Sequence, residues 1–182
     1  MAHGTEEKIM DAALKEFAEK GYAGAKTKVI AERSGLSEMT LFRRFKTKKN
    51  LFNHVLKKNQ NKVVKDFNLI MDESKIENPD DFLKTMIKIL FNLTEDNFEF
   101  ISIAILERQN ISESVIADII VYLTEIIDKI FPDSKVDTKV FVFSILSFIY
   151  LIVLDKRQGS TFVNHEDAIK KFISYSMMCI EL

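Results

Sequence analysis

Glycine and proline, the residues that end regular elements and form tight turns, are almost missing from this chain. Its 182 residues include five Gly and two Pro, and no Gly occurs between Gly35 and Gly159. Sandwiches and barrels of short strands need many more turn residues than that. Hydrophobic residues still make up 47% of the chain, which is enough to bury a core. We therefore expect an all-α protein.

Residues with catalytic or metal-binding chemistry are few and scattered. The chain has one cysteine, Cys179, and three histidines. A single cysteine cannot form an internal disulfide or a multi-cysteine zinc site, which suits a reducing cytoplasm. The sequence contains no P-loop, no Gly-rich dinucleotide turn and no His-Glu-x-x-His pattern. We expect no enzyme activity, no cofactor and no bound metal, and a cytoplasmic location.

The longest apolar run extends from Val140 to Leu154 and is interrupted by Ser144 and Ser147. As a helix it would span roughly 22 Å, short of the roughly 30 Å core of a bilayer, so we expect no membrane association. A helix that is apolar on all sides must be covered on all sides. One face would meet the chain's own core, and the other is expected to meet a second copy. The alternative is a central helix enclosed by its own domain.

Charge divides the chain into two predicted domains, residues 1–62 and residues 63–182. The first holds 14 Lys and Arg against 7 Asp and Glu, a net charge of +7, and the second holds 12 against 20, a net charge of −8. A basic segment joined to a larger acidic one suggests that the first binds a polyanion. The alternative is a solvated basic face without a partner. Residues 1–62 are called the head below.

Apolar periodicity and capping residues predict the positions of the helices. In the head we expect a helix from the cap Thr5 to Gly21, two short helices over 26–34 and 38–45, and a long helix that follows the cap Thr47 and extends to about residue 71. The two short helices are joined by Gly35, and the second is capped by Ser37, which is a helix-turn-helix pattern. Further helices are expected from Pro79, over 98–108, 112–131 and 137–156, and after the cap Asn164.

The residues of the head resemble the opening of TetR-family transcriptional regulators. The resemblance lies in the segments IMDAALKEFAEKGY (9–22), IAERSGLS (30–37), TLFRRF (40–45) and KKNLF (48–52). It extends without a gap from residue 5 to about residue 56. The resemblance implies a three-helix DNA-binding head followed by a helical domain for ligand binding and dimerisation.

The second helix of such a motif enters the major groove, where its N-terminal residues meet base edges. Arg43 is the natural reader of guanine, Thr40 suits a phosphate or a thymine methyl group, and Glu38 either accepts from cytosine or is a first-turn helix charge. The residues expected to contact DNA are Thr27, Lys28, Ser37, Glu38, Met39, Thr40, Phe42, Arg43, Arg44 and Lys48.

For the second domain the resemblance implies an apolar ligand pocket among the middle helices and a dimer interface formed by the last two helices. The pocket residues expected are Phe82, Met86, Leu90, Phe98, Ile105, Gln109 and Tyr122. The interface residues expected are Ile145, Ile149, Ile152 and Phe172. The predicted protein is a homodimeric repressor that binds a pseudo-palindromic operator in double-stranded DNA and is released by a small apolar effector. The alternative is a helical adaptor that uses its helix-turn-helix for protein contacts.

Overall fold

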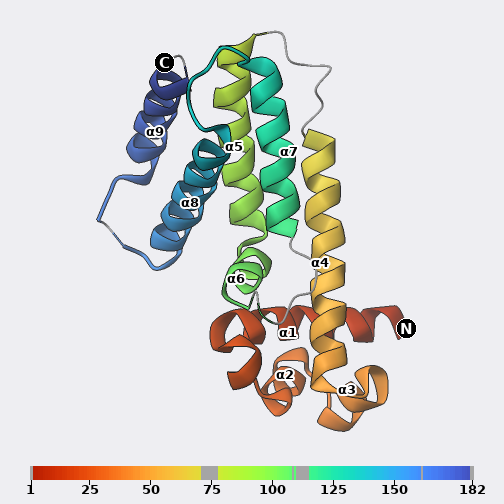
Figure 1. Cartoon of the computed structure of the whole chain (residues 1–182). Coiled ribbons are helices and arrows are strands. Elements are labelled where there is room, and N and C mark those ends of the chain that lie inside the picture. Colours follow the sequence, from red (N-terminus) through yellow and green to blue (C-terminus); the bar gives the residue numbers. More distant parts are fainter. Residues whose placement is uncertain (1, 71–77, 108, 110–114, 161, 181–182) are drawn as a thin grey trace. The chain divides into compact units, whose positions relative to one another are not determined.

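The structure, a computed structural model, describes residues 2–70, 78–107, 109, 115–160 and 162–180. The fold is all-α, with no strand among these residues (Figure 1). Its helices are α1 (Ala2–Gly24), α2 (Thr27–Ser34), α3 (Glu38–Phe45), α4 (Lys48–Ile70), α5 (Pro79–Asp96), α6 (Phe98–Leu106), α7 (Val115–Ile130), α8 (Thr138–Arg157) and α9 (His165–Ile180).

Most predicted helices are confirmed, and so are the caps Ser37, Thr47 and Asn164. The hydroxyl of Thr47 accepts the Asn50 N–H at 3.0 Å, and the Asn164 side chain accepts the Asp167 N–H at 3.0 Å. The first helix begins at Ala2 rather than after Thr5. The predicted end of the long helix at residue 71, the end of the helix at 108 and the start at 112 lie outside the described residues.

The chain forms two compact units, the first containing Met1–Lys65 and Asn97–Ser114 and the second containing Asp66–Asp96 and Val115–Leu182. The predicted domain boundary between residues 62 and 63 differs from the boundaries of these units, each of which contains two separate segments of the chain. That boundary stays a prediction. In the first unit α6 packs against α1, so that a segment assigned by sequence to the second domain belongs physically with the head. Helix α4 begins in the first unit and ends in the second.

The core of the first unit is a small cluster shared by the first four helices. Phe17 of α1 and Phe52 of α4 meet edge to face with ring centroids 5.0 Å apart, and Tyr22 lies 4.9 Å from Phe52. Aromatic pairs in this geometry stabilise a core beyond their buried area. The remaining fully buried apolar residues of the cluster are Ile9, Ala13, Ile30, Leu41, Leu51 and Val55.

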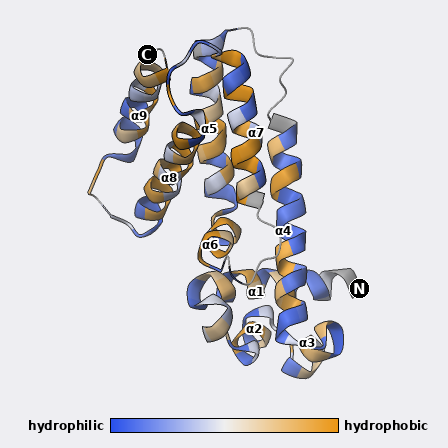
Figure 2. Ribbon diagram, viewed as in Figure 1, coloured by the Kyte–Doolittle hydropathy of each residue, from blue (hydrophilic) through white to orange (hydrophobic). Residues whose placement is uncertain are grey.

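In the second unit, α8 packs against α5 and α7, and α9 packs against α5. Hydrophobic residues recur along α5, α7 and α8 (Figure 2). Helix α8 has 20 residues, longer than the apolar run on which the expectation was based, and by length and composition alone it is long enough to cross a membrane. Six of its side chains are buried by its own chain: Phe141, Val142, Ile145, Ile149, Ile152 and Val153.

Gly21 interrupts α1 with a backbone that only glycine adopts readily. Its φ of 67° and ψ of 171° lie in a region that is essentially restricted to glycine. The following residue, Tyr22, donates its N–H to Glu107 Oε1 at 2.8 Å, and Glu107 comes directly after α6. A Cβ on Gly21 would lie 2.6 Å from the same carboxylate oxygen. The missing side chain therefore makes room for the hydrogen bond that ties α6 to the end of α1.

We expect Gly21→Ala to lower the free energy of unfolding by about 1–3 kcal/mol, the usual range for such backbone strain. The chain has no Trp, so urea unfolding followed by far-ultraviolet circular dichroism is the suitable measurement. Glu107→Ala in the same chain removes the close oxygen and leaves the backbone strain, so the double variant separates the two costs.

Gly24→Ala is the matched control. A Cβ there would lie 3.5 Å from the Lys20 Cβ, an ordinary contact, and no positive φ is involved. We expect stability equal to that of the unmodified protein or slightly higher, because alanine restricts the unfolded chain. Equal stability of Gly21→Ala and Gly24→Ala would contradict the role given to Gly21.

Candidate nucleic-acid interface

The turn between α2 and α3 is fixed by backbone hydrogen bonds. Gly35 has φ 70° and ψ 24°, the left-handed conformation that ends many helices. Its N–H donates to the Glu32 carbonyl at 3.1 Å, and the Leu36 N–H donates to the Ala31 carbonyl at 3.0 Å. These two bonds form a Schellman motif, and Ser37 then caps α3 by accepting the Thr40 N–H. Local chemistry alone therefore sets the direction in which α3 leaves the turn.

Several polar residues expected to contact DNA are bonded to their own chain. The Ser37 and Thr40 hydroxyl oxygens lie 2.9 Å apart. Thr27, at the start of α2, donates its hydroxyl to Glu38 Oε1 at 2.5 Å. Glu38 thus links the first turns of α2 and α3, which favours a structural role over the reading of cytosine.

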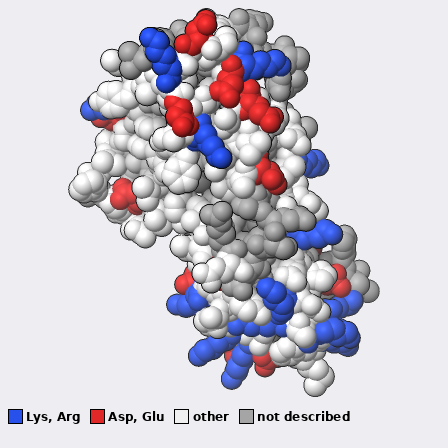
Figure 3. Space-filling model, viewed as in Figure 1, with Lys and Arg blue, Asp and Glu red and all other residues white. Residues whose placement is uncertain are grey.

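Other predicted residues of the head point outward. Met39 is 82% exposed and Phe42 is 39% exposed. Lys28 and Arg43 are exposed, and within the described part of the chain their side chains have no hydrogen bond or ion pair. Figure 3 shows Lys and Arg side chains gathered over the helices of the head.

Two of the cations predicted to contact DNA, Arg44 and Lys48, are bonded within the head. Arg44 Nη1 lies 3.4 Å from Glu6 Oε1 in an exposed ion pair, a kind that contributes little to stability. Lys48 Nζ donates to the Ala23 carbonyl at 3.2 Å and lies 4.9 Å above the ring of Tyr22. Lys48 therefore connects the start of α4 to the end of α1, a role that its sequence position did not indicate.

A buried carboxylate that sequence reasoning missed holds α1 against α2. Glu16 is 3% exposed, its Oε1 accepts the Lys26 N–H at 3.3 Å, and its Oε2 lies 3.3 Å from Arg33 Nη1. Arg33 also donates to both oxygens of Glu19, and this guanidinium holds the pKa of the Glu19 carboxyl below its ordinary value. The signal was present, because Glu16 occupies a helical position beside the apolar residues Ala13 and Phe17.

The seven predicted pocket residues are divided between the two units. Phe98, Ile105 and Gln109 belong to the first unit, and the other four belong to the second. Met86 and Leu90 are buried, and Ile105 is 40% exposed. The ring of Tyr122 meets that of Phe67 edge to face at 5.3 Å. That these residues form a ligand pocket stays a prediction.

Cavities occur elsewhere in the second unit, around the connection between α8 and α9. One of about 670 Å³ is lined by Phe91, Lys156, Ser160, Val163, Asn164, His165, Glu166 and Ile169. Another of about 300 Å³ is lined by Phe148, Leu151, Ile152, Leu154, Asp155, Gln158, Phe162 and Val163. None of the seven predicted pocket residues lines either cavity.

Hydrogen bonds and ion pairs hold this connection in place. His165 Nε2 lies 2.9 Å from Asp155 Oδ2, and hydrogen bonds from Ser160 and then His165 lower the pKa of the Asp155 carboxyl. Lys156 forms an ion pair with Glu95 of α5.

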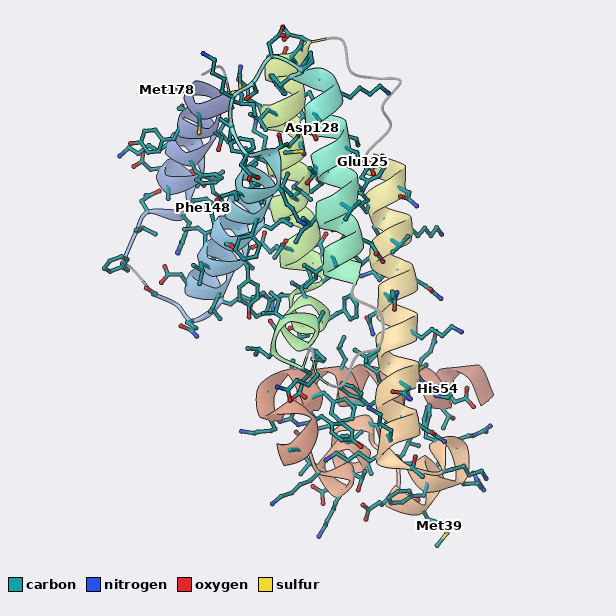
Figure 4. All side chains as sticks on the ribbon, in the orientation of Figure 1. Met39, His54, Glu125, Asp128, Phe148 and Met178 are labelled. Carbon is teal, nitrogen blue, oxygen red and sulfur yellow. The ribbon has the colours of Figure 1, made fainter. Side chains whose placement is uncertain are left out.

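The structure buries the interface residues predicted on α8 within a single chain, so their role in a dimer stays a prediction. Ile145, Ile149 and Ile152 are 1%, 1% and 6% exposed, so their side chains are already covered by their own chain. Phe172 of α9 is half-buried and stacks on Phe148 of α8 with ring centroids 3.8 Å apart. The exposed apolar side chains of these helices are Val140, Phe143 and Leu151 on α8 and Tyr175 and Met178 on α9. Two of the residues named here, Phe148 on α8 and Met178 on α9, can be located by their labels in Figure 4.

Comparison with known proteins adds family information to this geometry. The model of bacterial regulatory proteins of the TetR family matches residues 9–55. The uncharacterized HTH-type transcriptional regulator YvkB of Bacillus subtilis (strain 168) is 44% identical over 52 residues. That match covers 29% of this chain and 28% of the relative, so the likeness in sequence spans less than a third of its length.

Solved structures share the fold over nearly the whole chain. A TetR-like transcriptional regulator from Rhodococcus sp. RHA1 has a TM-score of 0.73 at 14% identity, covering 95% of this chain and 93% of its own. AibR, solved in complex with isovaleryl coenzyme A and operator DNA, has a TM-score of 0.68 at 15% identity, covering 94% and 97%. At these identities the likeness concerns the fold. Residues 9–55 therefore match the helix-turn-helix segment of TetR-family regulators by sequence, and the solved structures share their fold with nearly the whole chain.

Proposed function

We propose that this protein is a cytoplasmic, non-enzymatic repressor that binds a pseudo-palindromic operator as a homodimer and leaves it when a small apolar ligand binds. The observation that carries the proposal is the surface of α3, which presents exposed Met39 and Arg43, the latter without a partner among the described residues, from a helix that begins after the Gly35 turn. A recognition helix of this kind lies in the major groove of DNA. The net charge of +7 on the head favours a polyanionic partner.

The homodimer is supported by the uncovered apolar side of α8. Val140, Phe143 and Leu151 are each about 60% exposed, and they recur at helical spacing on a side that the chain's own core does not cover. A second copy, related by a two-fold axis, would cover this side with the same residues. Two heads that bind half-sites about one DNA turn apart, roughly 34–36 Å or a multiple, would then combine their contacts.

Regulation by a ligand is supported by the fold and by one of its relatives. AibR was solved with isovaleryl coenzyme A and operator DNA, so this fold accommodates both kinds of partner. In the present chain α4 is shared by both compact units, which gives a continuous element between the head and the remaining helices. A ligand can release the operator only if it binds the two states of the protein with different affinity.

The adaptor alternative differs from this proposal in one measurable property. A protein that binds DNA through phosphates loses affinity steeply as salt rises, because each neutralised phosphate releases counterions. A helix-turn-helix that serves protein contacts alone has no such dependence on DNA. Binding to the chain's own upstream DNA, measured across a range of salt concentrations, therefore separates the two functions.

The first prediction concerns DNA contacts. The logarithm of affinity should fall by about 0.9 per neutralised phosphate for each tenfold rise in salt. Arg43→Ala should cost about 1–3 kcal/mol on the preferred sequence and relax the preference. Lys28→Ala should weaken all sequences alike and reduce the salt slope by about 1. Fluorescence anisotropy with competitor duplexes measures these effects, and unchanged affinity and preference in Arg43→Ala would rule out this placement of α3.

The second prediction concerns the dimer. Leu151→Asp should place two like charges against the facing copy and halve the mass measured by light scattering. Operator affinity should fall as well, although the head is unchanged.

Val121→Asp is the control for the dimer, because Val121 is 53% exposed and lies on α7. It should leave the mass unchanged. Ile149→Asp should instead destabilise the fold, since Ile149 is buried within one chain. A monomer formed by the unmodified protein at micromolar concentration would contradict the dimeric mechanism.

The third prediction concerns the effector, with isovaleryl-CoA as the probe and free coenzyme A as the control. At 100 times its dissociation constant, a ligand stabilises the native state by about 2.7 kcal/mol. We expect isovaleryl-CoA to raise the melting temperature and lower operator affinity, and coenzyme A to do neither. Stabilisation by isovaleryl-CoA without loss of operator affinity would mean that its site is not regulatory.

A further inference from the structure

The polar side chains in the first turn of α3 are already bonded within the head. Ser37 Oγ accepts the Thr40 N–H at 3.2 Å and lies 2.9 Å from the Thr40 hydroxyl. The Glu38 carboxylate accepts the Thr27 hydroxyl at 2.5 Å. To read a base, each of these groups must first exchange its partner, which offsets part of the gain. Base recognition therefore falls to other residues of α3.

Met39, Phe42 and Arg43 share the outward side of α3. Positions 39, 42 and 43 are related by the spacings of three and four residues that bring helical side chains together. The 82% exposure of Met39 exceeds that of the other exposed apolar residues of α3 and α4. Figure 4 shows Met39 extending from α3 away from the other helices of the head. This surface therefore combines the exposed thioether side chain of Met39 with the guanidinium of Arg43, which has no partner in the part of the chain that the structure describes.

The chemistry of this surface fits the edge of a base pair in the major groove. An apolar side chain gains free energy only when its surface leaves water, and the unbranched thioether of methionine adapts to irregular shapes. The apolar group displayed by the major groove is the C5-methyl of thymine, whereas guanine displays two acceptors that match a guanidinium. The surrounding exposed cations, Lys28 and Lys46, favour DNA over an apolar protein partner.

We propose that Met39 determines operator specificity by packing on thymine methyl groups next to a guanine bound by Arg43. The inference rests on the DNA-binding function proposed above and names the bases that it selects. Four residues of helix span about 6 Å, and successive bases along a strand are about 3.4 Å apart. The selected thymine therefore lies within about two base pairs of the guanine. Glu38 reads no base and holds Thr27 instead.

The test begins with selection of binding sites from a pool of random duplexes by the unmodified protein. Each thymine of the selected half-site is then replaced by deoxyuridine, which removes the methyl group and leaves the hydrogen-bonding groups in place. Loss of one contacted methyl should reduce affinity about fourfold, the effect of one buried methylene-sized group. Met39→Ala should bind the thymine and deoxyuridine operators equally well at that position.

Three further variants serve as controls for the comparison of the thymine and deoxyuridine operators. Met39→Leu keeps an apolar side chain and should retain the thymine preference, whereas Met39→Gln keeps the length and should lose it. Val64→Ala removes another exposed apolar side chain, 40% exposed on α4, and should keep the ratio measured for the unmodified protein. Because Met39 is almost fully exposed, its variants should fold normally, which circular dichroism checks.

Two results would overturn the inference while leaving the proposed function intact. One is a selected half-site without thymine within about two base pairs of the guanine contacted by Arg43. The other is a Met39→Ala variant that discriminates between thymine and deoxyuridine as strongly as the unmodified protein. Enrichment of no sequence at all would refute sequence-specific DNA binding, and this inference with it.

Discussion

Hydrogen-bond satisfaction around the α2–α3 turn is the constraint on which the candidate interface depends. Gly35 reverses the chain in a conformation that lets two N–H groups reach the last carbonyls of α2, and Ser37 satisfies a free N–H at the start of α3. The Thr27–Glu38 bond then ties the two helix starts together. These bonds hold the first turn of α3 against the start of α2, and they leave Met39 and Arg43 on its exposed side.

Internal electrostatics distinguish the cations that hold the head together from those that are available to a partner. Arg33 is occupied by Glu16 and Glu19, and Lys48 is bonded to the Ala23 carbonyl beside the ring of Tyr22. Lys28 and Arg43 have no such partners among the residues that the structure describes. Net charge therefore overstates the cationic surface offered to DNA, and the local bonding decides which side chains contribute.

The apolar side chains of α8 are likewise of two kinds, those buried by the chain itself and those left exposed. The apolar composition predicts that this helix is covered on all sides, but it does not indicate which side faces the core of its own chain. Packing on α5 and α7 covers Ile145, Ile149 and Ile152, and leaves Phe143 and Leu151 exposed. The sequence therefore predicted an apolar helix, but it could not predict which of its sides the chain itself covers, because nearly every side of α8 is apolar.

Local chemistry made most of this protein predictable from its sequence. The scarcity of Gly and Pro indicated an all-α fold, and the residues Gly35, Ser37, Thr47 and Asn164 marked helix ends that depend on neighbours within a few positions. Only the tertiary structure decided the contacts between distant residues: the Glu38–Thr27 bond, the burial of Glu16 against Arg33, and the bond from Tyr22 to Glu107 that places α6 with the head. The physical reason is that caps and periodicity are encoded by adjacent residues, whereas the partner of a polar side chain and the buried side of an apolar helix are set by whichever elements pack there.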